Sequence, residues 1–415
     1  MRDVVVMGAG LAGLSAATRL QQAGREVTLV TFGIGGLQLG QGTIDVLGYA
    51  PDRVTNPVEA VDALRASDPA HPYAHFSGDE VAKALTWITD TVGDELLGGV
   101  PTRNVLLPTA VGALRPTALV QPSMVAGEPA DGKKYVFVGL RRLKDFYPDL
   151  VAANLARQTT PSGEPIRARA FHVDLEVRDG EHDTSGLNFA RALDREEVRK
   201  ELCDLVAPHL QEGEVVGFPA VLGVENLDAW RDIAARLGHD VFEVPLPPPS
   251  VPGMRLNERL TRLVKSGSRL MIGSRVLGYE GGNGHIDAVT VATAGHHSSI
   301  EASEFILATG GFESGAIAMD SFGTVTETTF GLPLVGTEGQ LVTDEYWGTD
   351  QPLFKVGVAV DDAMRPVDAG GAPVLDNLHA VGGLLAGATR WREKSGDAIA
   401  LVSALRAADS IIGSR

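Results

Sequence analysis

The stretch DVVVMGAGLAG, residues 3–13, decides the fold of this 415-residue chain. Its first residues are rich in valine, which favours a short β-strand, and three glycines follow at once. Residues 11–23 then carry apolar side chains at helical spacing, and residues 26–31 alternate like a second strand. The pattern predicts a β-α-β unit with a glycine-rich turn between the first strand and the helix.

The glycines of this turn are spaced as GxGxxG. At that spacing the backbone can turn tightly and approach a pyrophosphate, whose charge is stabilised at the N-terminus of the following helix. The motif alone is a weak signal, but its place between a strand and a helix supports a dinucleotide or flavin-phosphate site. We therefore expect the cofactor to contact Gly8, Gly10, Leu11, Ala12 and Gly13.

The end of the second predicted strand carries no carboxylate. Where such folds bind a full dinucleotide, an acidic residue at this place usually holds the ribose hydroxyls. Here the position is taken by Thr31, and Phe32 and Gly33 follow. Thr31 is still expected to contact the cofactor, but the missing carboxylate favours FMN over the second choice, FAD.

Later segments complete the expected cofactor site. A small-residue turn at residues 308–311 closes a β-run, and a pair of glycines precedes a final helix over residues 396–412. The N-terminus of that helix can direct its free N–H groups and its dipole at the flavin. The expected contacts are Ala308, Thr309, Gly310, Gly382, Gly383, Gly396, Asp397 and Ala398.

The amino-acid composition of the chain changes near residue 101, where prolines, threonines and valines become frequent. It changes again at the proline-rich segment 245–252. That segment is expected to be a stiff, extended connector. We predict an α/β, Rossmann-like FAD/NAD(P)-binding fold with an inserted α+β cap domain. The flavin-binding domain comprises residues 1–105 and 255–415, and the cap or substrate domain residues 106–254.

The remaining elements follow from local patterns. Helices are expected over residues 187–210, 227–237 and 256–265, and strands over 269–272, 276–279, 285–293 and 305–308.

Composition excludes several classes of function. A net charge of −17 disfavours nonspecific binding to nucleic acid or to an anionic bilayer. The only cysteine, Cys203, cannot build a Cys-ligated zinc or iron–sulfur site by itself and is expected to be a buried helical thiol. No metal site is expected, and His296 and His297 are a weak candidate. Because no signal peptide or membrane-spanning segment is recognisable, we expect a cytoplasmic protein.

Six segments are distinctive: residues 7–13, the loop 42–47 (GTIDVL), residues 107–117 (LPTAVGALRPT), 218–223 (FPAVLG), 247–256 (PPPSVPGMRL) and 377–383 (NLHAVGG). Together they resemble the B subunit of the anaerobic glycerol-3-phosphate dehydrogenase, within the class of FAD-dependent fumarate-reductase-like proteins. The resemblance runs over nearly the whole chain, and its proline-rich and Leu-Arg-Pro-Thr segments are the most specific.

The resemblance implies an FMN-binding subunit that pairs with a catalytic FAD subunit, which oxidises sn-glycerol 3-phosphate to dihydroxyacetone phosphate. A third subunit with iron–sulfur clusters would hold the pair at the inner membrane and pass electrons toward a quinone. Substrate would reach this chain only through its partner, if at all. Gly42 and Thr43 in the early loop are further expected cofactor contacts, and Asp45 is a polar contact there or a turn-stabilising residue.

Four residues are candidates for the chemistry. Arg115, Arg255 and Arg392 carry forked N–H donors that suit a phosphate or the negative charge of a flavin, with an interdomain salt bridge as the alternative. His379 precedes the glycine pair and is a candidate proton donor, with a hydrogen-bonded core histidine as the alternative.

Two other functions stay open on the sequence. The chain could be a self-sufficient flavin-dependent dehydrogenase or reductase of a small acid, or a scaffold that keeps the fold without the flavin. No Ser-His-Asp, Cys-His or HExxH arrangement is recognisable, so a hydrolase is unsupported.

Overall fold

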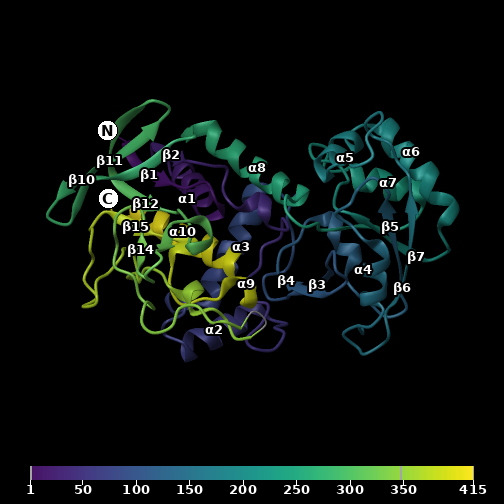
Figure 1. Cartoon of the computed structure of the whole chain (residues 1–415), viewed down its shortest axis with the longest axis horizontal. Helices are drawn as coiled ribbons and strands as arrows, with labels where there is room; N and C mark the ends of the chain where they lie inside the picture. Colours follow the sequence, from purple (N-terminus) through teal and green to yellow (C-terminus); the bar gives the residue numbers. More distant parts are fainter. Residues whose placement is uncertain (1, 346–347, 415) are drawn as a thin grey trace. The chain divides into compact units, whose positions relative to one another are not determined.

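The computed structural model describes residues 2–345 and 348–414 and divides the chain into two compact units (Figure 1). The first unit comprises Met1–Gly36, Asp45–Ile88 and Arg259–Arg415, and the second Leu37–Ile44 and Thr89–Glu258. The division falls within two helices, α3 (Gly78–Val92) and α8 (Val251–Gly267). Each unit has its own parallel sheet, and the predicted domain boundaries at 105/106 and 254/255 remain predictions.

The sheet of the first unit has five parallel strands in the order β9-β2-β1-β12-β15. Strand β1 therefore lies between its sequence neighbour β2 and a strand from far along the chain. This is the arrangement of a Rossmann-like dinucleotide-binding fold, as predicted. The strands are β1 (Arg2–Met7), β2 (Val27–Thr31), β9 (Arg269–Ile272), β12 (His296–Leu307) and β15 (Leu378–Ala380).

Strand β12 is longer than predicted, because the expected strand at 305–308 is only its end. Its first half pairs antiparallel with β11 (His285–Thr293), which in turn pairs with β10 (Arg275–Gly282). Its second half pairs in parallel with β1 and β15. The exposed polar residues of the first half hid this continuity, since a half-exposed meander strand has no apolar run.

Helix α1 (Leu11–Gln22) follows the glycine turn, and α10 (Gly396–Gly413) packs against it (Figure 1). Helix α10 is rich in alanine and buried over most of its surface, so it belongs to the core and not to an amphipathic surface layer. The other elements of this unit are α2 (Pro57–Ser67), α9 (Arg390–Glu393) and the small hairpin β13 (Ile317–Met319) and β14 (Val325–Glu327).

The second unit contains a four-stranded sheet in the order β6-β5-β7-β8. All its neighbouring strands are parallel, so the insert is of the α/β kind, whereas we expected an α+β cap. Its elements are the hairpin β3 (Val105–Pro108) and β4 (Leu114–Thr117), β5 (Lys134–Leu140), α4 (Pro148–Leu155), β6 (Arg167–Val173), α5 (Gly186–Leu193), α6 (Glu196–Val206), β7 (Glu214–Pro219), α7 (Ala229–Leu237) and β8 (Val241–Val244).

The proline-rich segment 245–252 differs from its prediction at one end. Helix α8 begins at Val251, five residues before the predicted start, and Pro252 is its second residue. Proline is tolerated in the first turn of a helix because the N–H groups there have no partner inside the helix. The extended connector is therefore shorter than predicted.

Candidate functional site

The glycine turn after β1 is closed on two sides and open on the third. If Gly8, whose φ is +111°, carried a Cβ, that atom would lie 2.3 Å from the carbonyl oxygen of Ala308. A Cβ on Gly13 would lie 1.9 Å from the carbonyl oxygen of Gly8. Gly8 thus lets β1 approach the end of β12, and Gly13 lets α1 approach β1. A Cβ on Gly10 would meet nothing within 4 Å. The open side of the turn is therefore the backbone of Gly10, which forms the N-cap of α1.

Four turns meet at this edge of the sheet, because the carboxyl ends of parallel strands point the same way. A Cβ on Gly35, beyond β2, would lie 2.1 Å from the oxygen of Ala9. One on Gly382, beyond β15, would lie 3.0 Å from Cβ of Ala12, and one on Gly383 would lie 3.2 Å from the nitrogen of Gly311. The predicted turns at 8–13, 308–310 and 382–383 are therefore brought together.

Two hydroxyl groups at this edge stand out. The side-chain oxygens of Thr309 and Thr389 are buried and make no hydrogen bond with any residue that the structure describes. A buried hydroxyl without a partner is costly, so its presence points to a polar group from outside the chain. Thr31 is different, because its hydroxyl donates to the carbonyl oxygen of Gly33 at 2.5 Å.

The start of α10 is tied to the loop 45–49. The nitrogen of Asp45 donates to the Asp397 carboxylate at 3.1 Å, and that of Ala398 donates to the Asp45 oxygen at 3.0 Å. The hydroxyl of the fully buried Tyr73 donates to the Val46 oxygen at 2.5 Å. Burial, with the nearby carboxylates of Glu393, Asp397 and Asp45, raises the pKa of Tyr73 well above its ordinary value, so the hydroxyl remains a donor.

Glu393, at the end of α9, connects this loop to a histidine. Its carboxylate accepts hydrogen bonds from His71 Nε2 at 3.1 Å, the nitrogen of Thr389 at 2.8 Å and the hydroxyl of Ser395 at 2.9 Å. Burial by itself would raise the pKa of Glu393, but these hydrogen bonds, that of His71 foremost, hold the pKa below its usual range. The carboxylate is therefore ionised at neutral pH.

The predicted chemical residues of the first unit lie in protein contacts. His379 is buried, with Nδ1 2.7 Å from the oxygen of Ala363 and Nε2 3.3 Å from the Glu304 carboxylate. Both ring nitrogens therefore face protein groups, which is the arrangement of the hydrogen-bonded core histidine. Arg392 is exposed and pairs with Asp350 at 2.7 Å.

Gly42, Thr43, Arg115 and Arg255 belong to the second unit. Arg255 is buried, and its guanidinium is held by the buried Glu243 carboxylate at 2.6 and 3.0 Å. It also donates to the oxygen of Gly223 at 2.5 and 3.0 Å. Arg255 therefore forms a salt bridge within its own unit, and Arg115 donates to the side chain of Gln41 at 2.5 Å.

The sequence places Arg390 between the glycine pair and the final helix but gives it no role, and it misses other residues of this edge. Arg390 lies beside the 308–311 turn, because a Cβ on Gly311 would be 2.8 Å from its Nη2, and it pairs with Glu313 at 2.8 Å. The dipeptide Gly35-Gly36 was a visible signal for its turn. His71, Tyr73 and Glu393 gave no signal, since each stands in an ordinary polar setting and only the fold brings them together.

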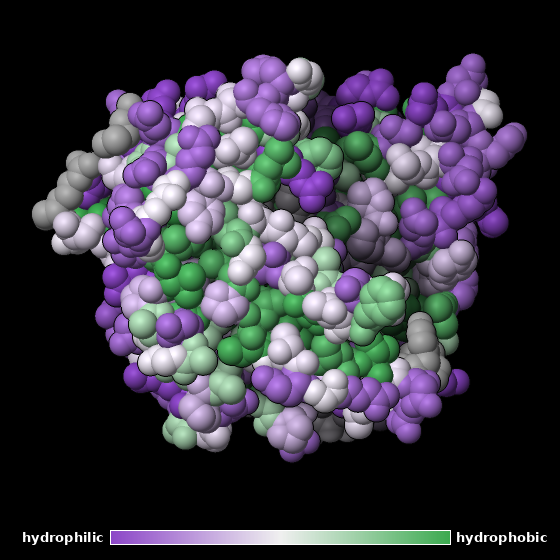
Figure 2. Space-filling model, turned by 60° about the vertical axis from the view of Figure 1, so that its left-hand side comes forward, coloured by the Kyte–Doolittle hydropathy of each residue, from purple (hydrophilic) through white to green (hydrophobic). Residues whose placement is uncertain are grey.

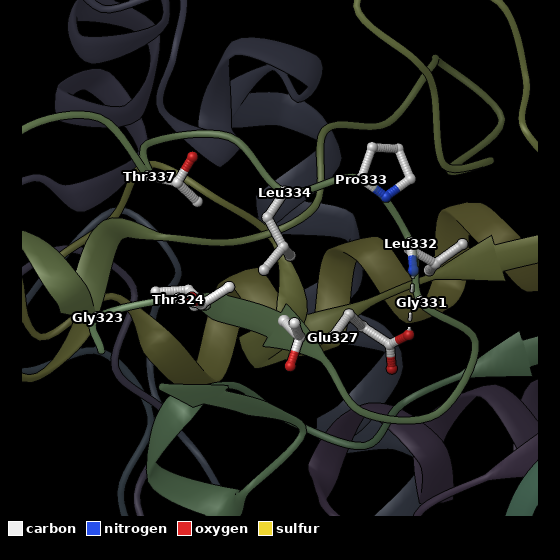
Figure 3. Close-up of a pocket in the computed structure, with 10 residues that line it drawn as sticks. Gly323, Thr324, Glu327, Gly331, Leu332, Pro333, Leu334 and Thr337 are labelled. Atoms are coloured by element: carbon white, nitrogen blue, oxygen red, sulfur yellow. Dashed lines mark hydrogen bonds between the residues drawn. The ribbon is translucent and has the colours of Figure 1, made fainter. Parts of the chain in front are cut away.

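A separate pocket of about 430 Å³ lies between β14 and the segment 331–337 (Figure 3). The carboxylate of Glu327 fixes its wall by accepting hydrogen bonds from the nitrogens of Thr329 and Phe330 at 2.8 and 2.7 Å. Among residues 2–345 and 348–414, no group of three or more His, Cys, Asp or Glu side chains could hold a metal ion. Nor is any helix in those ranges long and apolar enough to cross a bilayer.

Comparison with known proteins gives consistent relatives. Residues 3–399 match a family described as FAD binding domain. The probable B subunit of an anaerobic glycerol-3-phosphate dehydrogenase from Halobacterium salinarum is 33% identical over 414 residues, covering 97% of this chain and 95% of the relative. The B subunit of the anaerobic glycerol-3-phosphate dehydrogenase of Pectobacterium atrosepticum is 30% identical over 431 residues, with 99% and 98% covered.

Among solved structures, the open conformation of a flavocytochrome c3 fumarate reductase aligns with a TM-score of 0.45 at 12% identity, covering 99% of this chain and 78% of that one. The family match and the two relatives span nearly the whole chain. The protein therefore belongs to the FAD binding domain family of flavin-dependent oxidoreductases and, within it, to the family of anaerobic glycerol-3-phosphate dehydrogenase B subunits.

Proposed function

We propose that this chain is the flavin-carrying B subunit of an anaerobic glycerol-3-phosphate dehydrogenase, and that the flavin phosphate lies on the open side of the 8–13 turn. The observation that carries the proposal is the contrast within that turn. Gly8 and Gly13 are closed in by backbone atoms, while nothing lies within 4 Å of a Cβ on Gly10. A phosphate at the N-terminus of α1 would face the N–H groups and the positive end of the helix dipole.

The residues at this edge fit a flavin. The orphan hydroxyls of Thr309 and Thr389 would find a partner there, and the positive end of the α10 dipole would face a polar ring edge. When bound, a flavin supplies reversible uptake and release of two electrons. The chain itself supplies the phosphate turn, the helix ends and the packing that exclude water.

The identity of the flavin is where the observations disagree. No carboxylate follows β2, and the Thr31 hydroxyl is already bonded to Gly33, which leaves little for an adenosine ribose and favours FMN. The description of the matched family points to FAD instead. Heat or acid release of the cofactor from the purified chain, followed by mass spectrometry, distinguishes FMN, FAD and none.

A partner is part of the proposal, because electrons from glycerol 3-phosphate need an exit. Cys203, the chain's one cysteine, is buried, and burial raises its pKa to about 11, so it is not an electron-carrying ligand. We infer a catalytic FAD subunit that oxidises glycerol 3-phosphate to dihydroxyacetone phosphate. An iron–sulfur subunit would pass the electrons toward a quinone and hold the assembly at the cytoplasmic face of the inner membrane.

Exposed apolar side chains at the sheet edge support a docking partner. Phe32 and Ile34, which follow β2, are 73% and 52% exposed, and Ile272 at the end of the neighbouring β9 is 54% exposed. Figure 2 shows hydrophobic side chains gathered on one face of the molecule and bordered by hydrophilic ones. Large exposed apolar areas are typical of protein interfaces.

The test is anaerobic reduction of the bound flavin. The isolated chain should not be reduced by glycerol 3-phosphate, whereas addition of the catalytic FAD subunit should restore reduction and the two should co-purify. Fast reduction of the isolated chain would instead support the self-sufficient dehydrogenase. A chain purified without any flavin, and unable to take up FMN or FAD, would support the scaffold.

We also propose that residues 1–105 with 255–415 form the flavin-binding domain and residues 106–254 the inserted domain. Limited proteolysis should cut near the two boundaries and leave the terminal fragments associated with the flavin. Two stable fragments that are each contiguous in sequence and divide the chain in half would contradict this organisation.

A further inference from the structure

The carboxylate of Glu393 accepts hydrogen bonds from three donor groups. They come from an imidazole, a backbone N–H and a hydroxyl, belonging to His71, Thr389 and Ser395. The backbone oxygen of the same residue accepts from the nitrogens of Gly48 and Tyr49 at 2.8 and 3.1 Å. One residue thus joins the short helical turn at Pro72–His75, the loop 45–49 and the α9–α10 turn.

His71 can make its bond to Glu393 in only one tautomer. The nitrogen of Tyr73 donates to Nδ1 of His71 at 3.1 Å, so Nδ1 carries a lone pair. The proton of a neutral ring must therefore be on Nε2, which donates it to Glu393. His71 is buried, with its side chain 2% exposed, so solvent does not compete for this bond.

An acceptor without donors is needed at position 393. A glutamine there would place an NH₂ group against an imidazole N–H, a backbone N–H or a hydroxyl, and could satisfy only some of them. The carboxylate satisfies all three, and its charge strengthens each bond.

The consequence reaches the start of α10. Ser395 precedes the helix and donates to Glu393, and Tyr73, close to His71, contacts the Ser395 oxygen at 3.4 Å while donating to Val46. Two further hydrogen bonds, from Asp45 to Asp397 and from Ala398 to Asp45, connect the loop to α10. The loop 45–49 and the first turn of α10 are therefore held as one piece.

We propose that Glu393, oriented by His71, is a positioning residue that locks the first turn of α10 to the loop 45–49 and thereby sets how tightly the flavin is held. The inference rests on the proposed function, because it assumes that the flavin ring lies against this turn. Neither side chain is required to touch the cofactor. They act by fixing the position of the first turn of α10 and the direction of its helix dipole.

The experiment titrates apo-protein with FMN and, separately, with FAD, following flavin fluorescence and the shape of the visible absorbance band. Glu393→Gln is expected to raise the dissociation constant of the flavin by about tenfold or more and to change the band shape, because a bond to a charged group is lost. His71→Ala should act in the same direction. The double variant should be no worse than the more affected single variant, since the two residues form one link.

Two further variants keep the test decisive. Ser395→Ala removes one donor with little risk to folding and should weaken flavin binding by roughly threefold, as for one ordinary hydrogen bond. Glu327→Gln is the matched control, because Glu327 is a buried carboxylate of the same unit that, like Glu393, accepts a backbone N–H group. It should lower the melting temperature and leave flavin binding unchanged.

The outcomes separate this inference from the proposed function. Unchanged flavin affinity and band shape in Glu393→Gln and Ser395→Ala would overturn the positioning role. So would additive effects of His71→Ala and Glu393→Gln, or an equal loss of affinity in Glu327→Gln. If Gly10→Val loses its flavin while Glu393→Gln keeps it, only the positioning role fails. If Gly10→Val keeps its flavin, the proposed phosphate site fails.

Discussion

The two units of the chain each contain a parallel sheet and a helix with a glycine at its start, Gly10 as the N-cap of α1 and Gly186 as the first residue of α5, yet the two helix starts differ. At the start of α1, nothing lies within 4 Å of a Cβ on Gly10. At the start of α5, a Cβ on Gly186 would lie 3.4 Å from both Leu246 and Val221, which are buried beyond the ends of β8 and β7. Topology alone therefore does not distinguish the two helix starts, and the space beside Gly10 is what supports the proposed phosphate site at α1.

The largest effect expected from this comparison is in Gly10→Val. Gly10 has φ −76°, which a valine can adopt, so the protein should fold. Its side chain would fill the space in which phosphate meets the backbone, so bound flavin should be lost completely. The measurement is the flavin-to-protein ratio of the purified variant.

Gly186→Ala is the control from the second unit. The new Cβ would make ordinary van der Waals contacts with Leu246 and Val221, and flavin content should stay at the wild-type level. Stoichiometric flavin in Gly10→Val, or loss of flavin in Gly186→Ala, would break the comparison.

The second expected effect concerns the buried ion pair of the second unit. Arg255→Ala would leave the Glu243 carboxylate buried, with the hydroxyl of Ser123 and the nitrogen of Leu222 still donating to it. An uncompensated buried charge typically costs about 3–5 kcal/mol. Denaturant unfolding followed by circular dichroism should show a loss of that size. A loss below about 1 kcal/mol would make Arg255 a candidate for ligand binding again.

A smaller effect is expected from acid. Hydrogen bonding lowers the pKa of Glu393 in the folded protein below the ordinary value of 4.5. A carboxylate with a lowered folded-state pKa contributes stability above its unfolded pKa and loses that contribution as pH falls through the folded value. The wild type should therefore be more stable than Glu393→Gln at pH 7, by about 1.5–3 kcal/mol for a bond to a charged group.

Melting temperatures of both proteins between pH 7 and pH 3 should converge, with the convergence beginning below about pH 4.5. A difference that grows as pH falls would mean that the carboxylate is not the stabilising form.

The smallest effect is expected in Arg392→Ala. Arg392 is exposed and its ion pair with Asp350 is at the surface, so the loss should be below about 1 kcal/mol. Thermal unfolding provides the measurement, and a larger loss would show that the pair supports the α9 turn. Slower flavin reduction in the reconstituted complex, without any loss of stability, would support the chemical role predicted from the sequence.

The β-α-β unit at residues 2–31 could be predicted from sequence because its signals are local. A valine-rich strand, GxGxxG and a helical apolar pattern fall within one short stretch. The final helix and the turns at 308–310 and 382–383 were found for the same reason. The four parallel strands of the second unit were missed. Strands β5, β7 and β8 are buried on both faces and show no alternation, and β6 is a partly exposed edge strand with two arginines.

The polar network around Glu393 could not be predicted. His71 and Glu393 are 322 residues apart, and only the fold brings them within 3.1 Å. The opposite difficulty arises at His379 and Arg255, where residue type suggested chemistry and the structure provides protein partners. A side chain's type indicates what it could do, and its neighbours decide whether that capacity is already used.

Strand β12 has a consequence for how this protein is made in the cell. Arg2 of β1 is in register with Ala302 of β12, so β1 can pair with β12 only after a further 300 residues have been synthesised. At a synthesis rate of about 5–20 residues per second, that wait lasts roughly 15–60 s. During it, the valines at positions 4–6, fully buried in the finished protein, have no strand on one side. The edge of β1 that pairs with β12 therefore stays open during synthesis, and we expect the yield of the protein to depend on how well this edge is shielded.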